Sequence, residues 1–230
     1  MVLNTIGQAL LFGHWFCVQL AMNVSNLQCK SAMSHINYGI YRLFKILATM
    51  NVLQSSKNTL RQNKTYWLSC NGKHLTFSDY FDDSLDNFTF PSSLTHVTFG
   101  DWFDQPLDNV TLPSSLTHLT LNGDFDQPLD NVMLPSSLTH LTFGYWFNQP
   151  VDNVMLPSSL THLTLKGDFN QPLDNVILPS SLTHLTFGRL FNQPLVSLPL
   201  LLSHLTIGDC FNHSLNNVKL PARCNITMSK

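Results

Sequence analysis

Residues 160–181 read LTHLTLKGDFNQPLDNVILPSS, and this stretch decides the fold of the chain. Close copies of it recur, and one phenylalanine marks each copy. That residue stands, at steps of 22, at Phe81, Phe103, Phe125, Phe147, Phe169 and Phe191. Another copy, at Phe211, follows after 20 residues. Internal repetition at a fixed period of this size is typical of solenoid proteins.

The first half of the repeat has the pattern of a short strand. Apolar Leu163 and Leu165 alternate with polar His162 and Thr164, so one face of the strand is expected to be buried. The opening Leu-x-x-Leu-x-Leu fits the signature of leucine-rich repeats. We therefore predict a leucine-rich-repeat-like β-solenoid with a parallel β-sheet on one face.

The second half of the repeat must return the chain to the start of the next strand. It contains Pro172 and Pro179, and proline breaks the interior of a helix. A mostly extended, irregular or 3₁₀ back is therefore predicted in place of crossover helices. Stacked coils would bury Leu on Leu and Phe on Phe, at roughly 1.5–3 kcal/mol per side chain. We also expect Asn170 and its equivalents to form a hydrogen-bonded ladder inside the turn.

A longer period overlies the 22-residue repeat. The strands end alternately in a Phe type, as at Phe99-Gly100-Asp101-Trp102, and in a Leu type, as at Leu121-Asn122-Gly123-Asp124. The Phe type returns at residues 143–146 and the Leu type at residues 165–168. This alternation indicates a duplicated pair of coils.

The phrase Phe-Asn-Gln-Pro-Leu, followed by Leu-Pro-Ser-Ser-Leu-Thr-His-Leu-Thr-Phe-Gly, resembles the FNIP repeat family over roughly residues 75–221. The resemblance implies a relative of leucine-rich-repeat proteins, of a kind abundant in social amoebae and giant viruses. Many members carry an N-terminal F-box, which implies recruitment of a substrate to a ubiquitin ligase. Here residues 1–66 contain Leu27-Gln28-Cys29-Lys30 but lack the Leu-Pro start of an F-box.

The chain is accordingly divided into three parts. Residues 1–66 are expected to form a helical N-terminal cap or a degenerate F-box-like segment, residues 67–222 a solenoid of about seven rungs, and residues 223–230 a C-terminal tail. Polar residues such as Gln8, His14 and Gln19 interrupt the apolar stretch at residues 5–24, so no membrane span is expected. The expected location is the cytoplasm, or the host cytoplasm if the protein is viral.

Composition and motifs narrow the function. Charged residues make up 11% of the chain and the net charge is −2, which gives no basic surface for nucleic acid. The five cysteines contain no CxxC pair. No phosphate-binding loop, metalloprotease or serine-hydrolase motif occurs. We therefore expect a non-enzymatic protein-interaction scaffold with no catalytic residue, no metal site and no cofactor.

The candidate partner-binding face is a double column on the strands. One position of each repeat is histidine, and the alternation places it on the same exposed face as a threonine two residues later. Aromatic residues near the ends of two strands are of types enriched in binding hot spots. The predicted face comprises His96, His118, His140, His162, His184, Thr98, Thr120, Thr142, Thr164, Thr186, Trp102, Tyr145 and Trp146.

Three interpretations of this face remain open. The partner is expected to be a protein of unknown identity, and a ubiquitin-ligase adaptor is one partner that the family resemblance implies. Alternatively, the chain is a structural or orphan product of duplication with no dedicated partner. The third interpretation is a surface that responds to metal or pH through the histidine column.

Overall fold

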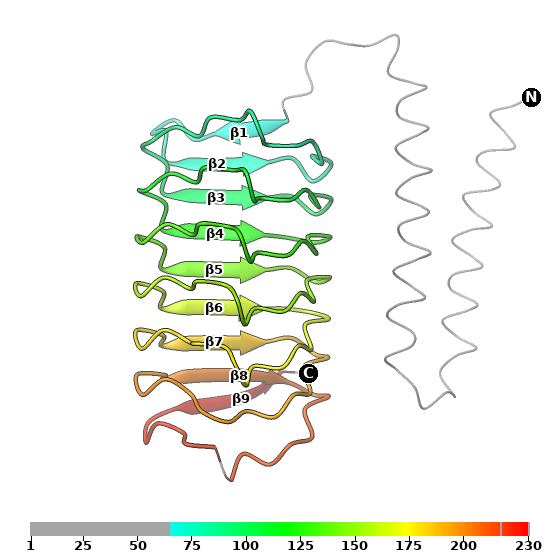
Figure 1. Ribbon diagram of the computed structural model, residues 1–230, viewed down its shortest axis with the longest axis vertical. Helices are drawn as coiled ribbons and strands as arrows, with labels where there is room; N and C mark the ends of the chain where they lie inside the picture. Colours follow the sequence, from blue (N-terminus) through cyan, green and yellow to red (C-terminus); the bar gives the residue numbers. More distant parts are fainter. Residues whose placement is uncertain (1–64, 217, 230) are drawn as a thin grey trace, which may run out of the picture. The chain divides into compact units, whose positions relative to one another are not determined.

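The computed structural model describes residues 65–216 and 218–229 of the chain. These residues form a coil with one nine-stranded sheet along its length (Figure 1). The strands are β1 (Tyr66–Leu68), β2 (His74–Phe77), β3 (His96–Phe99), β4 (His118–Leu121), β5 (His140–Phe143), β6 (His162–Leu165), β7 (His184–Phe187), β8 (His204–Gly208) and β9 (Asn225–Ser229). The predicted β-solenoid is confirmed. Almost all of the expected helical cap lies outside the described residues.

The strands pair in sequence order and in one register. From β2 to β9 every pair is parallel, whereas β1 pairs antiparallel with β2. In the regular coils His118 lies beside His140, and Leu119 beside Leu141. The 20-residue step from His184 to His204 keeps the same register, so the missing two residues are absorbed outside the sheet.

The sheet extends beyond the predicted solenoid boundaries. β1 begins at Tyr66, and the segment 223–230, predicted as a tail, contains β9. β9 adds a rung, with Asn225 beside His204 and Ile226 beside Leu205. Its sequence, NITMS, lacks the Leu-Thr-His phrase, which is why the repeat pattern alone did not predict it.

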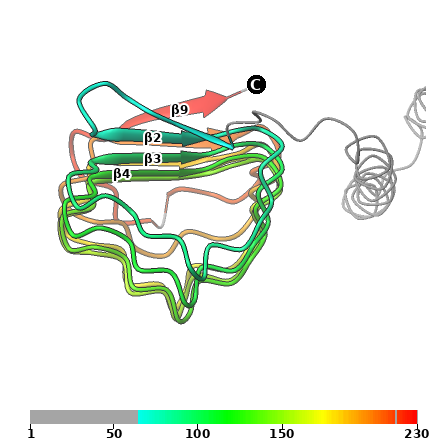
Figure 2. The same ribbon diagram turned by 90° about the horizontal axis from the view of Figure 1, so that it is seen from above.

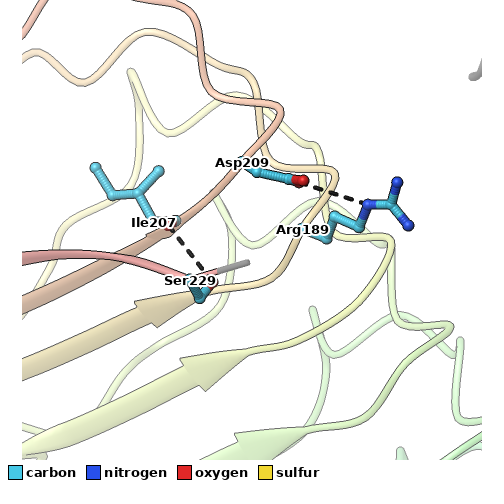
Figure 3. Close-up of polar contacts among 4 residues, drawn as sticks. All are labelled: Arg189, Ile207, Asp209 and Ser229. Carbon is cyan, nitrogen blue, oxygen red and sulfur yellow. Dashed lines mark hydrogen bonds and ion pairs between the residues drawn. The ribbon is translucent and has the colours of Figure 1, made fainter.

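Two side-chain contacts join the coils near the end of the sheet (Figure 3). The Arg189 Nε lies 3.5 Å from the Asp209 Oδ1, and both side chains are exposed. The Ser229 hydroxyl donates to the carbonyl oxygen of Ile207 at 3.5 Å. The ion pair joins the turns after β7 and β8, and an exposed pair of this kind contributes little stability. The Ser229 contact adds to the backbone pairing of β8 with β9.

The core consists of columns of identical or similar apolar side chains. In the regular strands the apolar residues are buried and the His and Thr residues half-buried, as the alternation predicts. The marker phenylalanines stack in nearly parallel planes, with neighbouring ring centroids 5.9–6.2 Å apart. Most of these rings are fully buried. Because each coil lacks a core of its own, its apolar side chains are buried only by the coils on either side.

The back of the coil contains no helix within the described residues, as its prolines predict. Viewed along the solenoid, the sheet lies on one side and the return segments converge on a narrow ridge opposite (Figure 2). Tight turns shape this half: the amide of Val110 donates to the Leu107 carbonyl, and that of Leu116 to the Pro113 carbonyl, both at 3.0 Å.

The expected asparagine ladder is present. The Oδ1 of Asn148 accepts the backbone amide of Asn170 at 2.9 Å, and the Oδ1 of Asn170 accepts that of Asn192 at 2.8 Å. In the earlier coils Asp82, Asp104 and Asp126 supply the same Oδ1 acceptor. The ladder satisfies amides that no strand partner reaches.

Glycines permit close approach of adjacent coils where the strands end. Gly123 and Gly167, both in Leu-type coils, have φ values of +48° and +61°. A Cβ on Gly123 would lie 2.1 Å from the Asp101 carbonyl oxygen. The two-coil superperiod therefore reflects a real alternation in turn conformation.

Gly123→Ala is predicted to destabilise the protein more than Gly72→Ala. Both glycines have positive φ, so both substitutions incur about 1–2 kcal/mol of left-handed strain. Only Gly123 is pressed against backbone, because a Cβ on Gly72 would meet just the Ser93 Oγ at 3.7 Å. We expect an extra cost of about 1–3 kcal/mol at Gly123 in urea unfolding. Equal costs would contradict the close packing of these turns.

Asn170→Ala is predicted to cost about 1–3 kcal/mol in the free energy of unfolding, because the amide of Asn192 loses its acceptor. Asn170→Asp is the matched control, since Asp104 and Asp126 hold the equivalent position in this chain. It should cost less than about 1 kcal/mol. Chemical denaturation of both variants measures the difference, and an alanine variant as stable as the aspartate variant would exclude the ladder as a stabilising element.

Candidate binding face

Seven histidines form a continuous stack across β2–β8. Neighbouring ring centroids are 4.0–4.3 Å apart and the ring planes lie within 12° of parallel. The stack, called the histidine ladder below, comprises His74, His96, His118, His140, His162, His184 and His204. Sequence analysis placed five of these in the binding face, and the structure brings all five into the one stack. The in-register pairing holds each ring above the next.

A second column, of hydroxyl residues, contacts the ring of each ladder histidine from His96 to His204. The Oγ1 of Thr139 donates to the carbonyl oxygen of Thr117 at 3.0 Å, and it lies 2.8 Å from the Nδ1 of His140. The same arrangement occurs at His118, His162 and His184. A hydroxyl has one proton. We predict that this proton goes to the carbonyl, so that the imidazole Nδ1 carries a hydrogen and donates it to Oγ1.

This assignment leaves the Nε2 of each neutral ring as a hydrogen-bond acceptor. Sequence analysis missed the residues that impose it, which are Thr95, Thr117, Thr139, Thr161, Thr183 and Ser203. Their signal is visible in retrospect, because a hydroxyl residue precedes the ladder histidine in each of these six coils. The alternation of apolar and polar residues within the strand gave no reason to select the residue that precedes the strand.

The surroundings of the ladder disfavour its charged form. Partial burial lowers the pKa of His118, and the positive charges of nearby ladder histidines lower it further. The pKa values of His96, His140, His162 and His184 are lowered in the same way, with burial the larger cause. These five rings are thus held in their neutral form to a lower pH than isolated histidines.

The remaining predicted residues divide into two groups. The threonines from Thr98 to Thr186 share the exposed side of the sheet with the ladder and are half-buried. The aromatic residues lie beyond the strand ends: Trp102 and Trp146 are half-buried and Tyr145 is 68% exposed. The Trp102 ring meets Tyr80 edge-on at 5.0 Å. The structure therefore provides a regular His and Thr surface with an aromatic border.

The ladder geometry is unsuited to chelation of a metal by adjacent rings. Imidazole ligands place their lone pair directly at the metal, at about 2.0–2.1 Å. In rings stacked face to face, the lone pairs run side by side and do not converge. No group of three or more metal-ligating side chains occurs within residues 65–216 and 218–229. In the same ranges, no helix is long and apolar enough to cross a membrane.

Comparison with known proteins gives the family. The sequence pattern of the FNIP Repeat family matches residues 67–101, 103–145 and 147–190. The chain belongs to the FNIP repeat family. The three matched segments cover most of β1 and all of β2–β7, so the histidine ladder and the asparagine ladder are built largely from FNIP repeats.

One solved structure supports the leucine-rich-repeat character of this FNIP chain. It is described as "the crystal structure of CroV588 a novel circular LRR protein structure", with 43% sequence identity and a TM-score of 0.57. The alignment covers 68% of this chain and 27% of that chain, so the present chain spans about a quarter of that protein. No curated protein matches the chain.

Thr139→Val is predicted to release His140 from its fixed tautomer. The substitution removes the acceptor of Nδ1–H and the donor to the Thr117 carbonyl, at a cost of about 1–2 kcal/mol. Nitrogen NMR of the imidazole should show the Nδ1–H form in the natural protein and a mixture in the variant. Thr142→Val, on the exposed side of the same strand, is the control and should leave the tautomer unchanged. Observation of the Nε2–H form in the natural protein would contradict the assignment.

Acid is predicted to destabilise the fold. The pKa values of the five ladder histidines from His96 to His184 are lowered in the folded state, so the unfolded chain binds more protons and the fold loses stability as the pH falls. The loss should begin near about pH 6.5, where unfolded histidines titrate, and continue through the lower folded values. Urea unfolding at a series of pH values measures it. His140→Asn should reduce the pH dependence, whereas His213→Asn, outside the ladder, should not; a stability independent of pH from about 7.5 to 5 would refute this.

Proposed function

We propose that the chain is a non-enzymatic scaffold that binds a protein partner on the exposed side of its sheet. The observation that carries this proposal is the pairing of a rigid His and Thr surface with the aromatic border at Trp102, Tyr145 and Trp146. Tyr145 in particular is 68% exposed, although it is large and partly apolar. Tyrosine and tryptophan are enriched among residues that dominate binding energy.

The repeat architecture supports the same role. Solenoids present an extended surface built from many short coils, and such surfaces commonly bind other proteins. The family and the circular leucine-rich-repeat relative are consistent with it.

Recruitment to a ubiquitin ligase is the finer form of this proposal. It would require residues 1–66 to contact an adaptor while the sheet holds the substrate. Its support is the F-box found in many FNIP proteins, and its weakness is the missing Leu-Pro start in this chain. The corresponding location would be the cytoplasm, or the cytoplasm of a host cell for a viral protein.

Affinity capture with matched variants tests the proposal. The full chain is used as bait in host-cell lysate beside Tyr145→Ala and Ile177→Ala, both of which alter exposed side chains. Ile177 lies in a return segment on the back, so it controls for the loss of an exposed apolar group. A partner of the sheet should be recovered by the natural chain and Ile177→Ala, with binding to Tyr145→Ala weakened by about 30-fold.

The outcomes separate the alternatives. Recovery of a ligase adaptor and a cullin would support the finer proposal, provided that removal of residues 1–66 abolishes their recovery. Equal binding by both variants would place the partner elsewhere. Failure to capture any partner with tags at either end would favour an orphan product of duplication.

A further inference from the structure

The histidine ladder presents a row of nitrogen atoms to solvent. Each Nδ1 from His96 to His204 is engaged by a hydroxyl, whereas the Nε2 atoms make no hydrogen bond within the described residues. In the same residues no buried side-chain nitrogen or oxygen lacks a partner. The unpartnered Nε2 atoms are therefore accessible to water and to ligands.

Protonation preserves the geometry of this row. In a protonated imidazole both nitrogens carry hydrogen, so Nδ1–H donates to the threonine hydroxyl oxygen and Nε2–H is left free to donate to a ligand. Each rung then directs an N–H⁺ donor outward. Partial burial opposes this protonation. Repulsion between charged neighbouring rings, whose centroids lie only 4.0–4.3 Å apart, opposes it as well. An external anion would relieve that repulsion.

The sheet itself supplies no counter-charge. None of the nine strands contains Asp, Glu, Lys or Arg. The charged residues next to the ladder strands lie outside them and carry both signs: Lys73, Asp79, Asp101, Lys166, Arg189, Asp209 and Arg223. Cys224, which precedes Asn225 of β9, is another titratable group near the end of the ladder, whereas Tyr66 of β1 contacts Phe77 and Phe88 on the core side of the sheet. The uncharged Asn225 ends the row, and Asp209 is already paired with Arg189.

We propose that the acid form of the ladder binds a linear polyanion that bears phosphate or sulfate groups. The rungs repeat at about 4.8 Å, the spacing of hydrogen-bonded strands, so the ladder is a straight row of cationic donors. The threonine two residues along each strand adds a hydroxyl donor on the same face. Charge-assisted hydrogen bonds to oxyanions are short and strong. This inference does not depend on the proposed protein partner.

A chain of anions fits the row better than a single anion. One phosphate relieves the repulsion at one or two rungs, whereas a connected series neutralises several neighbours at once. Single-stranded nucleic acid is less suited, because its binding uses aromatic side chains between the phosphate contacts. Here the residues beside the ladder on the same face of β2–β8 are threonines, and the exposed Tyr145 lies beyond the strand end.

Isothermal titration calorimetry of the full chain with polyphosphate at about pH 7.5 and 5.5, at constant ionic strength, tests the proposal. Affinity should rise by about tenfold or more at the lower pH, as expected when several charge-assisted contacts form. Titration in buffers of different ionisation enthalpy should show proton uptake on binding at the lower pH. A sulfated glycan, tested in parallel, distinguishes the two sources of oxyanion, and monophosphate at equal phosphate concentration should bind far more weakly.

Variants assign the site. Replacement of His118, His140 and His162 together by Asn imitates the natural Asn225 of β9 and should abolish the gain in affinity at low pH. His213→Asn, outside the ladder, should retain it. The proton uptake of the natural chain provides a second test that does not require the triple variant to fold. Affinity independent of pH, binding without proton uptake, or tighter binding of single-stranded DNA or polyglutamate would overturn the proposal.

Discussion

In-register parallel pairing of nearly identical strands is the constraint on which the rest of the structure depends. Backbone hydrogen bonds place His118 beside His140 and Leu119 beside Leu141, so side chains of one kind form columns, except at the strand ends, where Phe and Leu alternate. A shift by one residue would exchange the buried and exposed faces of a strand. The phenylalanine column, the asparagine ladder and the histidine ladder are three consequences of this single register.

The same constraint explains how so polar a coil is stable. Each coil buries its leucine and phenylalanine side chains only against neighbours, and each also passes polar groups to the next coil. Asn170 accepts an amide of the following coil, and Thr139 donates to a carbonyl of the preceding one. Because such hydrogen bonds recur in every coil, a defect in one coil removes contacts from two neighbours. The histidine ladder carries the cost of this arrangement. Because the register places histidine beside histidine, protonated rings repel one another.

Much of the fold could be predicted from the sequence because a repeat expresses the same physical preference many times. The alternation around Leu163 and Leu165 correctly predicted the buried face of the strand. Pro172 and Pro179 predicted a back without helices in the described residues, and Asn170 predicted the hydrogen-bonded asparagine ladder. β9 could not be predicted, because its pairing comes from the adjacent edge of β8 and not from a repeated phrase. The role of Thr139 was also hidden, since it depends on a carbonyl 22 residues earlier that only the folded register brings within reach.

The most direct test of the register is a set of distances along the sheet. The native cysteines are replaced, and one spin label is placed at Thr76 and a second at Thr164, Thr186 or Thr206. Pulsed electron paramagnetic resonance then measures the distance between the two labels. The pairs span four, five and six rungs, so the distances should be about 19, 24 and 29 Å, rising by about 4.8 Å per rung. The last step should equal the others although its coil has 20 residues, because Thr186 pairs with Thr206. Unequal steps, or a distance that does not grow from rung to rung, would contradict the in-register stack.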